Sequence, residues 1–367
     1  MLNLNIKIQS RPLVYGYSNA RAHAMFSKLL TSQQLLELAS MPSTTTIAEA
    51  LNRTDYKEDI LKLSLYYRGE QLIDFALSEN FARFCKKLYK ITPNSDKKII
   101  FAILSRWDSH NIKTLILGRK QQKSWSDIRP YLVPAGSFSI EDLEKLYNSK
   151  DVLEFYSQFK QTEFGQGFIH SKIPLLTKPL KEAFKAMDSN SFISEMLILS
   201  LDFYQYQILS RIVEEYRNEK NLAQFLSSFT DQKNLEIILR LSRENIEEEK
   251  IKEYLLPGGK ISSNRWLKAA AKKDVYSIIS SLADILPLKE ILEEVKKTTK
   301  LSEIEKLISI EFSKKRLKLF RGANLSIAVL VAALFFKEQE VENIRKILRG
   351  KQYGFSEEEL KKLILLY

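Results

Sequence analysis

The chain contains few side chains of the kinds that catalyse reactions or bind metals. Its histidines are His23, His110 and His170, which lie far apart in the sequence. No H-E-x-x-H or C-x-x-C pattern occurs, and neither does a G-x-x-x-x-G-K-[ST] phosphate loop or a G-x-S-x-G motif. A metal site would need ligands from scattered positions. We therefore expect no catalytic residues, no metal and no cofactor, and we predict that the chain is not an enzyme.

Two weaker features could still carry chemistry. Cys85 lies among apolar residues at helical spacing, which favours a structural thiol over a nucleophile. It is the single cysteine, so it cannot form an intramolecular disulfide, and this indicates a reducing compartment. The G-Q-G at 165–167 could bind phosphate, but no predicted strand precedes it. An enzyme whose catalytic residues gather around His170 and Gly167 stays open as an alternative.

A repeated asparagine is the clearest pattern in the sequence. It occurs at Asn111, Asn234 and Asn343, each followed by aliphatic residues one, four and five positions later. Those offsets lie on one face of a helix, so each copy predicts the same buried apolar stripe. The stripe residues are Ile112, Leu115, Ile116, Leu235, Ile238, Leu239, Ile344, Ile347 and Leu348.

Two copies share a turn further along the chain. Pro134 in Y-L-V-P-A-G and Pro257 in Y-L-L-P-G-G each stand 23 residues after their asparagine. Proline and glycine there should end a helix and turn the chain. A degenerate fourth copy opens the protein, with Asn19 followed 23 residues later by Pro42.

The spacing of the repeated asparagines, which we call marks, predicts the organisation of the chain. We expect three similar helical units, at 1–107, 108–230 and 231–367. The mark at Asn343 lacks the proline turn, and we hypothesise that the last unit closes against the first. The units would then form a ring or funnel instead of an open solenoid.

Acidic residues near the marks suggest a local structural role. Asp108 and Asp231 stand three positions before their asparagines, where they could N-cap a helix. Each asparagine would then lie near the third helical position and bond a nearby backbone group. Asn343 should lie mid-helix, so capping cannot explain every copy.

Basic residues near the marks could contact the carboxylates of a partner, or could be solvated helix ends. Three of them lie two positions after an asparagine, although Glu236 replaces the basic residue in one copy. The candidate partner-contact or repeat-motif residues are Asn19, Arg21, Asn111, Lys113, Arg119, Asn234, Arg240, Asn343, Arg345 and Arg349.

The composition indicates the elements that must position these residues. The 367 residues are 44% hydrophobic and include 11 glycines and 9 prolines, which leaves long stretches without helix breakers. Long helical stretches are expected at 80–90, 193–217 and 302–350, and no convincing run of alternating strands occurs. We predict an all-α protein.

One apolar run and the net charge indicate which locations and which kinds of partner fit the sequence. The run Leu325–Phe336 has 12 residues, fewer than the roughly 20 of a membrane span, and predicts a helix buried in the core. The N-terminus lacks the continuous apolar region of a secretory signal. A net charge of +12 could indicate nucleic acid, an anionic membrane or an acidic partner. Lysines alternate with glutamates, which favours an ordinary solvated helix surface.

Several stretches together resemble the C subunit of archaeal and bacterial V/A-type ATPases, which is related to the d subunit of eukaryotic V-ATPases. The opening Y-G-Y-S-N-A-R-A-H-A-M-F-S-K-L-L is similar to the first signature of that family. The Asn111 and Asn234 segments with their proline turns are similar to its internal motifs. K-E-Q-E-V-E-N-I-R-K-I-L-R-G-K, at 337–351, resembles its C-terminal signature.

The resemblance implies an all-helical, funnel-shaped protein with pseudo-threefold symmetry. It implies a non-catalytic central-stalk protein on the cytoplasmic face of the membrane, peripheral to it. There the protein would couple the shaft subunits to the rotor ring of proteolipid subunits, with no specific nucleic acid and no small-molecule substrate. The alternative of another class is a helical-repeat scaffold that binds nucleic acid, which the charge and the repetition favour.

Overall fold

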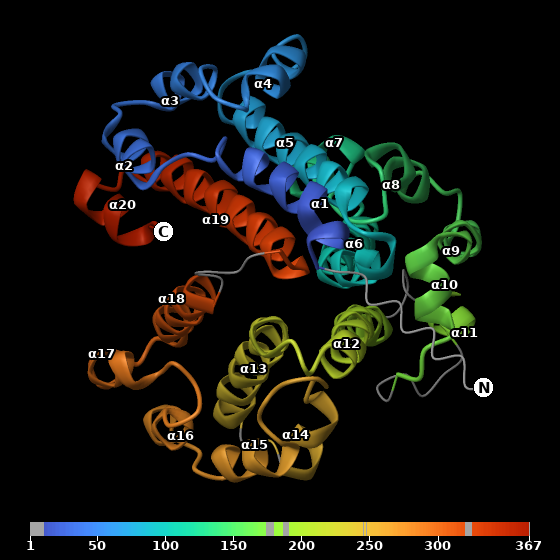
Figure 1. Cartoon of the computed structure of the whole chain (residues 1–367). Helices are drawn as coiled ribbons and strands as arrows, with labels where there is room; N and C mark the ends of the chain where they lie inside the picture. Colours follow the sequence, from blue (N-terminus) through green and yellow to red (C-terminus); the bar gives the residue numbers. More distant parts are fainter. Residues whose placement is uncertain are drawn as a thin grey trace, which may run out of the picture. The chain divides into compact units, whose positions relative to one another are not determined.

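The computed structural model describes residues 11–173, 180–185, 191–244, 246, 248–319 and 325–366. Helices make up all the regular secondary structure of these residues, and no strand occurs among them (Figure 1). The all-α prediction is confirmed. The chain divides into two compact units: unit 1 is Met1–Phe101 with Phe320–Tyr367, and unit 2 is Ala102–Leu319. The division into three similar units stays a prediction.

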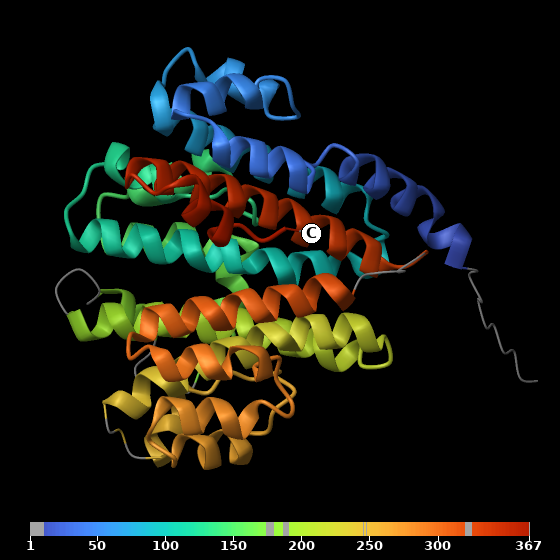
Figure 2. The same ribbon diagram turned by 90° about the vertical axis from the view of Figure 1, so that its left-hand side faces the viewer.

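Unit 1 contains both ends of the chain. Its longest helix, α19, packs against α1 and α5, and the three lie side by side (Figures 1 and 2). The helices of unit 1 are α1 (Arg11–Phe26), α2 (Ser32–Ser40), α3 (Thr44–Leu51), α4 (Lys57–Leu63), α5 (Gly69–Ile91), α19 (Ile327–Gln352) and α20 (Glu357–Leu363), with the 3-10 turn η1 (Asn94–Asp96) and the start of α6 (Lys97–Lys120).

The apolar run before Phe336 forms the first half of α19. Ile327, Leu330 and Leu334 are buried, so the predicted core helix is confirmed. The helical stretch expected at 302–350 is not continuous, because α18 ends at Leu319 and α19 begins at Ile327. Residues 320–324 of that stretch lie outside the described residues.

Unit 2 contains most of α6 and the segment that follows it. Within the unit α12, α13 and α18 run alongside one another (Figure 2). The helices are α7 (Trp125–Ile128), α8 (Ile140–Tyr147), α9 (Val152–Gln161), α10 (Glu163–Ile169), α11 (Leu180–Lys185), α12 (Ser191–Glu215), α13 (Lys220–Arg243), α14 (Glu248–Tyr254), α15 (Ser263–Ala270), α16 (Val275–Leu282), α17 (Leu292–Lys297) and α18 (Leu301–Leu319), with the 3-10 turns η2 (Arg129–Tyr131) and η3 (Lys289–Ile291).

Unit 2 has two separate hydrophobic clusters. The first joins the apolar stripe of α6 to α8–α12 and is rich in aromatic rings, most of which pack edge to face or tilted. The second joins the stripe of α13 to α15–α18 around the buried Trp266 and Phe312. All nine stripe residues are buried, as the repeat predicts, three of them on α19.

Short helices begin at hydroxyl side chains that cap them. Ser139 accepts a hydrogen bond from the Asp142 amide, and the Asp142 carboxylate accepts one in return from the Ser139 amide. Such capping boxes satisfy amides that would otherwise lack a partner. The same arrangement starts α2, α3, α7 and α20 at Thr31, Ser43, Ser124 and Ser356.

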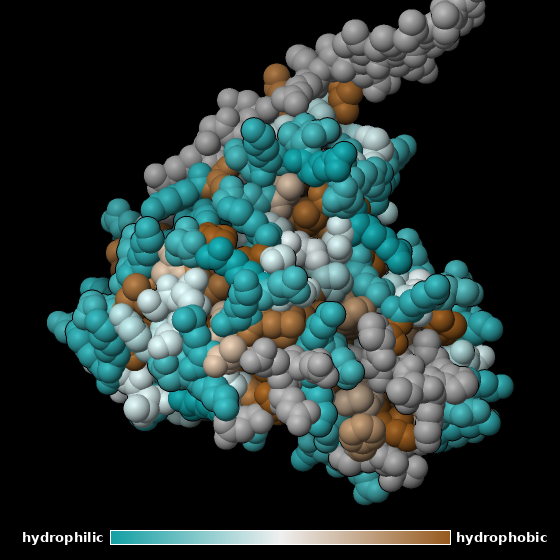
Figure 3. Space-filling model, turned by 90° about the horizontal axis from the view of Figure 1, so that it is seen from below, coloured by the Kyte–Doolittle hydropathy of each residue, from teal (hydrophilic) through white to brown (hydrophobic). Residues whose placement is uncertain are grey.

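The face drawn in Figure 3 is mainly hydrophilic, with hydrophobic residues in small separated groups. This agrees with a surface on which acidic and basic residues are mixed, since 28% of the residues are charged.

Candidate functional site

Three of the marked asparagines make the same pair of hydrogen bonds. Asn111 donates from its amide nitrogen to the Val133 carbonyl at 2.7 Å and accepts from the Val133 N–H at 2.9 Å. Asn234 does the same with Leu256, at 3.0 and 2.8 Å. Asn343 does so with Leu365, at 2.8 Å for both bonds. The bonded residue lies 22 positions after the asparagine in each copy, and we call this pair of bonds the amide clamp.

The amide clamp explains why asparagine is needed at these positions. A primary amide carries one donor and one acceptor side by side, which matches the N–H and C=O of an extended residue. All three asparagines are buried, so the bonded backbone groups have no access to bulk water. Val133 and Leu256 each precede a proline, which restricts them to extended conformations. Pro134 and Pro257 therefore hold the preceding residue in the conformation that the asparagine binds.

Asn19 makes the same pair of amide bonds as the other three marks, but its partner lies 307 positions away instead of 22. It bonds both backbone groups of Ser326, the N-cap residue of α19, at 3.1 Å each, and no bond joins it to the segment around Pro42. The interpretation of Asn19 and Pro42 as a fourth copy of the same turn is therefore wrong. Asn19 instead attaches α1 to the start of the last long helix of unit 1.

The acidic residues three positions before the asparagines are not N-caps. Asp108 and Asp231 lie in the interiors of α6 and α13, so that prediction is wrong. Asp108 accepts hydrogen bonds from the backbone N–H groups of Ser137, at 2.8 Å, and Phe138, at 3.3 Å. Both groups lie directly before α8. We call such a contact between a helix carboxylate and the backbone an acid clamp.

Asp231 forms the equivalent acid clamp on the other copy in unit 2. It accepts from the backbone N–H groups of Lys260 at 2.9 Å and Ile261 at 3.2 Å, directly before Ser262, the N-cap residue of α15. The sequence separations of 29 and 30 residues are the same as for Asp108. The long helix of each copy therefore fixes the start of the following short helix.

A third acid clamp is made by Glu340, which the sequence reasoning missed. Glu340 also stands three positions before its asparagine, so the acidic residue at that position was the available signal. It accepts a hydrogen bond from the Leu30 N–H, directly before Thr31, the N-cap residue of α2. The carboxylate also accepts from the Tyr56 hydroxyl and from the Lys337 ammonium, each at 2.6 Å. The last long helix thus fixes the first short helix of the chain.

A glycine makes room for each acid clamp of unit 2. A Cβ atom added to Gly136 would lie 2.1 Å from an oxygen of Asp108, and one added to Gly259 would lie 2.3 Å from an oxygen of Asp231. These distances are far below van der Waals contact. The glycines after Pro134 and Pro257 are therefore required by the close approach of a carboxylate to the backbone.

We expect Gly136→Ala and Gly259→Ala each to lower the free energy of unfolding by about 1–3 kcal/mol, because the added methyl group must displace a buried carboxylate. Urea unfolding followed by circular dichroism measures this. Gly16→Ala is the matched control, because Gly16 lies in α1 and its added Cβ meets nothing within 4 Å. That variant should be unchanged or slightly more stable. Equal effects at all three positions would contradict the role of the glycines.

Burial changes the ionisation of the acid clamps. Removal from water raises the pKa of Asp108 from 3.8 to about 7, although the hydrogen bonds from Ser137 and Phe138 act to lower it. Burial also raises the pKa of Asp231, against the hydrogen bonds from Lys260 and Ile261. Both carboxyls therefore hold a proton in the folded protein at pH values where the unfolded chain has lost it.

The raised pKa of Asp108 predicts a pH dependence of stability. Its contribution is fully present below about pH 4 and is lost as the pH rises to about 7, because the unfolded chain releases this proton first. The loss is at most about 1.4 kcal/mol per pH unit. Urea unfolding of the wild type and of Asp108→Asn between pH 4.5 and 8 measures it, since asparagine does not titrate. Wild-type stability should fall relative to the variant over this interval. A constant difference would show an ionised Asp108 throughout.

Most of the predicted basic residues bind within the chain. Lys113 pairs with Asp202 at 2.5 Å, and Arg240 pairs with Glu305 through two bonds, at 2.7 and 3.0 Å. Arg119 donates to the carbonyls of Tyr147, at the end of α8, and of Ser149, and Arg345 donates to Ser78 at 2.7 Å. Each of these four side chains is held by a different partner. Arg21 and Arg349 are exposed.

The other candidates for chemistry have structural contacts. His110 hydrogen-bonds the Tyr131 carbonyl and His170 that of Gln166, while Cys85 is buried in α5. The two glycines of G-Q-G lie in α10 beside the Phe159 carbonyl and the Tyr204 hydroxyl, where any side chain would collide. Among the described residues, no group of three or more His, Cys, Asp or Glu is placed to hold a metal ion.

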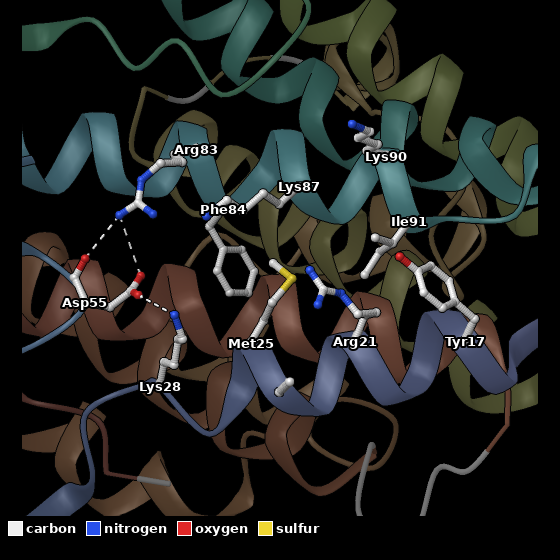
Figure 4. A pocket seen from close by; sticks show the side chains of 11 residues that line it. Tyr17, Arg21, Met25, Lys28, Asp55, Arg83, Phe84, Lys87, Lys90 and Ile91 are labelled. Atoms are coloured by element: carbon white, nitrogen blue, oxygen red, sulfur yellow. Dashed lines mark hydrogen bonds and ion pairs between the residues drawn. The ribbon is translucent and has the colours of Figure 1, made fainter. Parts of the chain in front are cut away.

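One pocket in unit 1 collects basic side chains. It lies between α1 and α5, has a volume of about 460 Å³, and was not found from the sequence (Figure 4). Arg21 and Lys28 come from the α1 side, and Arg83, Lys87 and Lys90 come from α5. The sequence signal would have been the recurrence of lysine and arginine along 83–90, which helical periodicity alone assigns to an ordinary surface.

These features define an all-α protein in which long helices repeat one pattern of amide and acid clamps. The chain belongs to the ATP synthase (C/AC39) subunit family, whose family model matches residues 18–363. The resemblance to the C subunit of V/A-type ATPases is confirmed.

Relatives named as the C subunit of A-type ATP synthases match nearly the whole chain. The protein of Methanocaldococcus jannaschii is 25% identical over 357 residues, which cover 96% of this chain and 86% of the relative. That of Archaeoglobus fulgidus is 26% identical over 356 residues, 96% of each chain. That of Pyrococcus furiosus is 28% identical over 342 residues, 91% of this chain and 86% of the relative.

Proposed function

We propose that this chain is a non-catalytic central-stalk component of a rotary V/A-type ATPase. It couples the central shaft to the rotor ring of the membrane and lies peripherally on the cytoplasmic face. The family match over residues 18–363 carries this proposal. None of the helices in the described part of the chain is long and apolar enough to cross a membrane.

The clamps support a role in transmitting force. A protein that passes torque between two partners must deform little. Here, buried hydrogen bonds join α6, α13 and α19 each to a segment 22 or more residues away, beyond what helix packing alone provides. Because each clamp ends in a backbone group instead of a flexible side chain, motion of the long helix is carried directly to the attached segment.

We also propose that three similar units form a closed funnel with pseudo-threefold symmetry. In all three amide clamps the asparagine and its bonded residue are 22 positions apart, and this equal separation supports similar units. The acid clamp of Glu340 on Leu30, and the bonds of Asn19 to Ser326, support closure, because they join the two ends of the chain within unit 1. An experimental structure of the assembled complex tests this arrangement.

The coupling role is tested by assembling the complex with and without this chain. Catalytic heads and shaft subunits are combined with detergent-solubilised rotor ring in lipid vesicles, and ATP hydrolysis and ion transport are measured together. Without the chain, hydrolysis should continue while transport is lost, and adding the chain should restore transport. Transport at the full rate without the chain would overturn the proposal. Tight, salt-sensitive retention of RNA by the purified chain, with no binding to shaft or ring, would favour the nucleic-acid scaffold.

A further inference from the structure

The basic pocket of unit 1 has the features of a binding site. Its volume of about 460 Å³ falls within the range of ligand pockets, roughly 300–1,000 Å³. In Figure 4, Arg21 and Met25 point from α1 toward α5, and Phe84 points from α5 toward α1. The pocket is therefore bordered by cations and has an apolar interior.

Two of its five cations are neutralised by neighbouring acids. Lys28 pairs with Asp55 at 3.1 Å, and Arg83 pairs with Asp59 at 2.7 Å and more loosely with Glu58 at 3.5 Å. Burial acts to raise the pKa of Asp55, but Lys28 and Arg83 outweigh it and hold that pKa below its usual value. Asp55 therefore stays charged at neutral pH, and the ion pairs of Lys28 and Arg83 balance the charge at this end of the pocket.

The remaining three cations are not neutralised by neighbouring acids in this way. Among the described residues, no carboxylate forms an ion pair with Arg21, Lys87 or Lys90. They border an apolar surface made by Met25 and Ile91 together with the buried Phe84. At the edge lies Tyr17, which is 69% exposed although it is a large aromatic residue. The complementary ligand therefore carries both apolar groups and more than one negative charge.

The position of the cations favours a peptide over a compact phosphate. Phosphate sites gather donors on one point, commonly at a helix N-terminus. Here the cations lie on two helices, and the α5 residues belong to its C-terminal half, where the helix dipole disfavours a single concentrated anion. Carboxylates spaced along an apolar segment can meet Arg21 and Lys87 separately while an apolar side chain enters between them.

We propose that this pocket receives an acidic, partly apolar segment of a partner protein. On the proposed function above, on which this assignment rests, that partner is the shaft. An apolar side chain of the segment contacts Phe84 and Met25, and its carboxylates pair with Arg21, Lys87 and Lys90. The Arg83–Asp59 and Lys28–Asp55 pairs hold the wall of the pocket in place.

The test reverses the three unbalanced charges in the full-length protein, as Arg21→Glu, Lys87→Glu and Lys90→Glu together. Affinity for purified shaft subunits and for the detergent-solubilised ring is measured separately by biolayer interferometry over a salt series. Shaft affinity should fall at least about 100-fold while ring affinity is unchanged. The wild-type affinity for the shaft should also weaken as salt rises. The control is Lys57→Glu, Lys62→Glu and Lys86→Glu, which changes the net charge equally at exposed positions of the same unit outside the pocket.

The outcomes separate this assignment from the coupling role. If the wild type binds the shaft and the pocket variant binds it equally well, the pocket assignment is wrong and the coupling role stands. If the wild type binds neither shaft nor ring, the proposed function itself fails. Vesicles containing phosphatidylglycerol provide a third measurement. Loss of vesicle binding in the pocket variant, with shaft binding intact, would assign the pocket to lipid headgroups and overturn the proposal.

Discussion

Replacing Lys337 with methionine should lower the free energy of unfolding by about 3–5 kcal/mol, because the Glu340 carboxylate would be left buried without its cation. Both side chains are almost completely inaccessible to solvent, with the ammonium 2.6 Å from the carboxylate. The ammonium also donates to the Tyr56 hydroxyl at 3.0 Å and lies 4.1 Å from the centre of that ring. Without Lys337, the Leu30 N–H and the Tyr56 hydroxyl would be the partners left to the charge among the described residues. Urea and thermal unfolding measure the loss.

The double variant Lys337→Met with Glu340→Gln separates charge from packing. It removes both charges, so it should recover part of the stability that the single variant loses. The control is Lys361→Met in α20, which breaks the exposed pair of Lys361 with Glu357 and should cost less than about 1 kcal/mol. A single variant no less stable than this control would show that the buried pair contributes little.

Asn234→Ala should lower the free energy of unfolding by about 2–5 kcal/mol. The substitution leaves the buried N–H and C=O of Leu256 without partners, and each unsatisfied group costs about 1–3 kcal/mol. Hydrogen exchange gives a local measurement, because the Leu256 amide should lose its protection. The control is Asn264→Ala, at an exposed position of α15, which should change stability by less than about 0.5 kcal/mol. A protected Leu256 amide in Asn234→Ala would mean that the amide clamp does not hold this segment.

The helices and their buried faces could be predicted because they depend on local periodicity. The stripe after each asparagine is buried in all three copies, and the apolar run at 325–336 begins a core helix. The break between α18 and α19 was missed because the residues on both sides favour helix. Leu325, two residues before α19 begins, adopts a left-handed conformation with φ of +46°, and nothing in its residue type predicts this.

The positions of the clamps could be predicted, but their bonds could not. Asparagine and aspartate near a helix commonly bond neighbouring backbone, and this led to the wrong assignment of Asp108 as an N-cap. Its real partner lies 29 residues away, and only the packing of α6 on the next segment brings the two together. Glu340 was missed because its partner, Leu30, lies near the other end of the chain and glutamate replaces the aspartate of the other copies. The basic pocket depends on two helices at once, so neither helix reveals it alone.

The placement of α19 has a consequence for the order in which the protein is made and folds. Glu340 binds a backbone group 310 residues earlier, and Ser326 binds Asn19 across 307 residues. When α1 and α5 leave the ribosome, the helix that covers them has not been synthesised. The first helices of unit 1 must therefore wait, with groups such as the Phe26 ring lacking their partner Phe336 of α19, while unit 2 can complete its contacts. Contacts of such long sequence separation form slowly, so closure of the chain is expected to be the last and slowest step of folding.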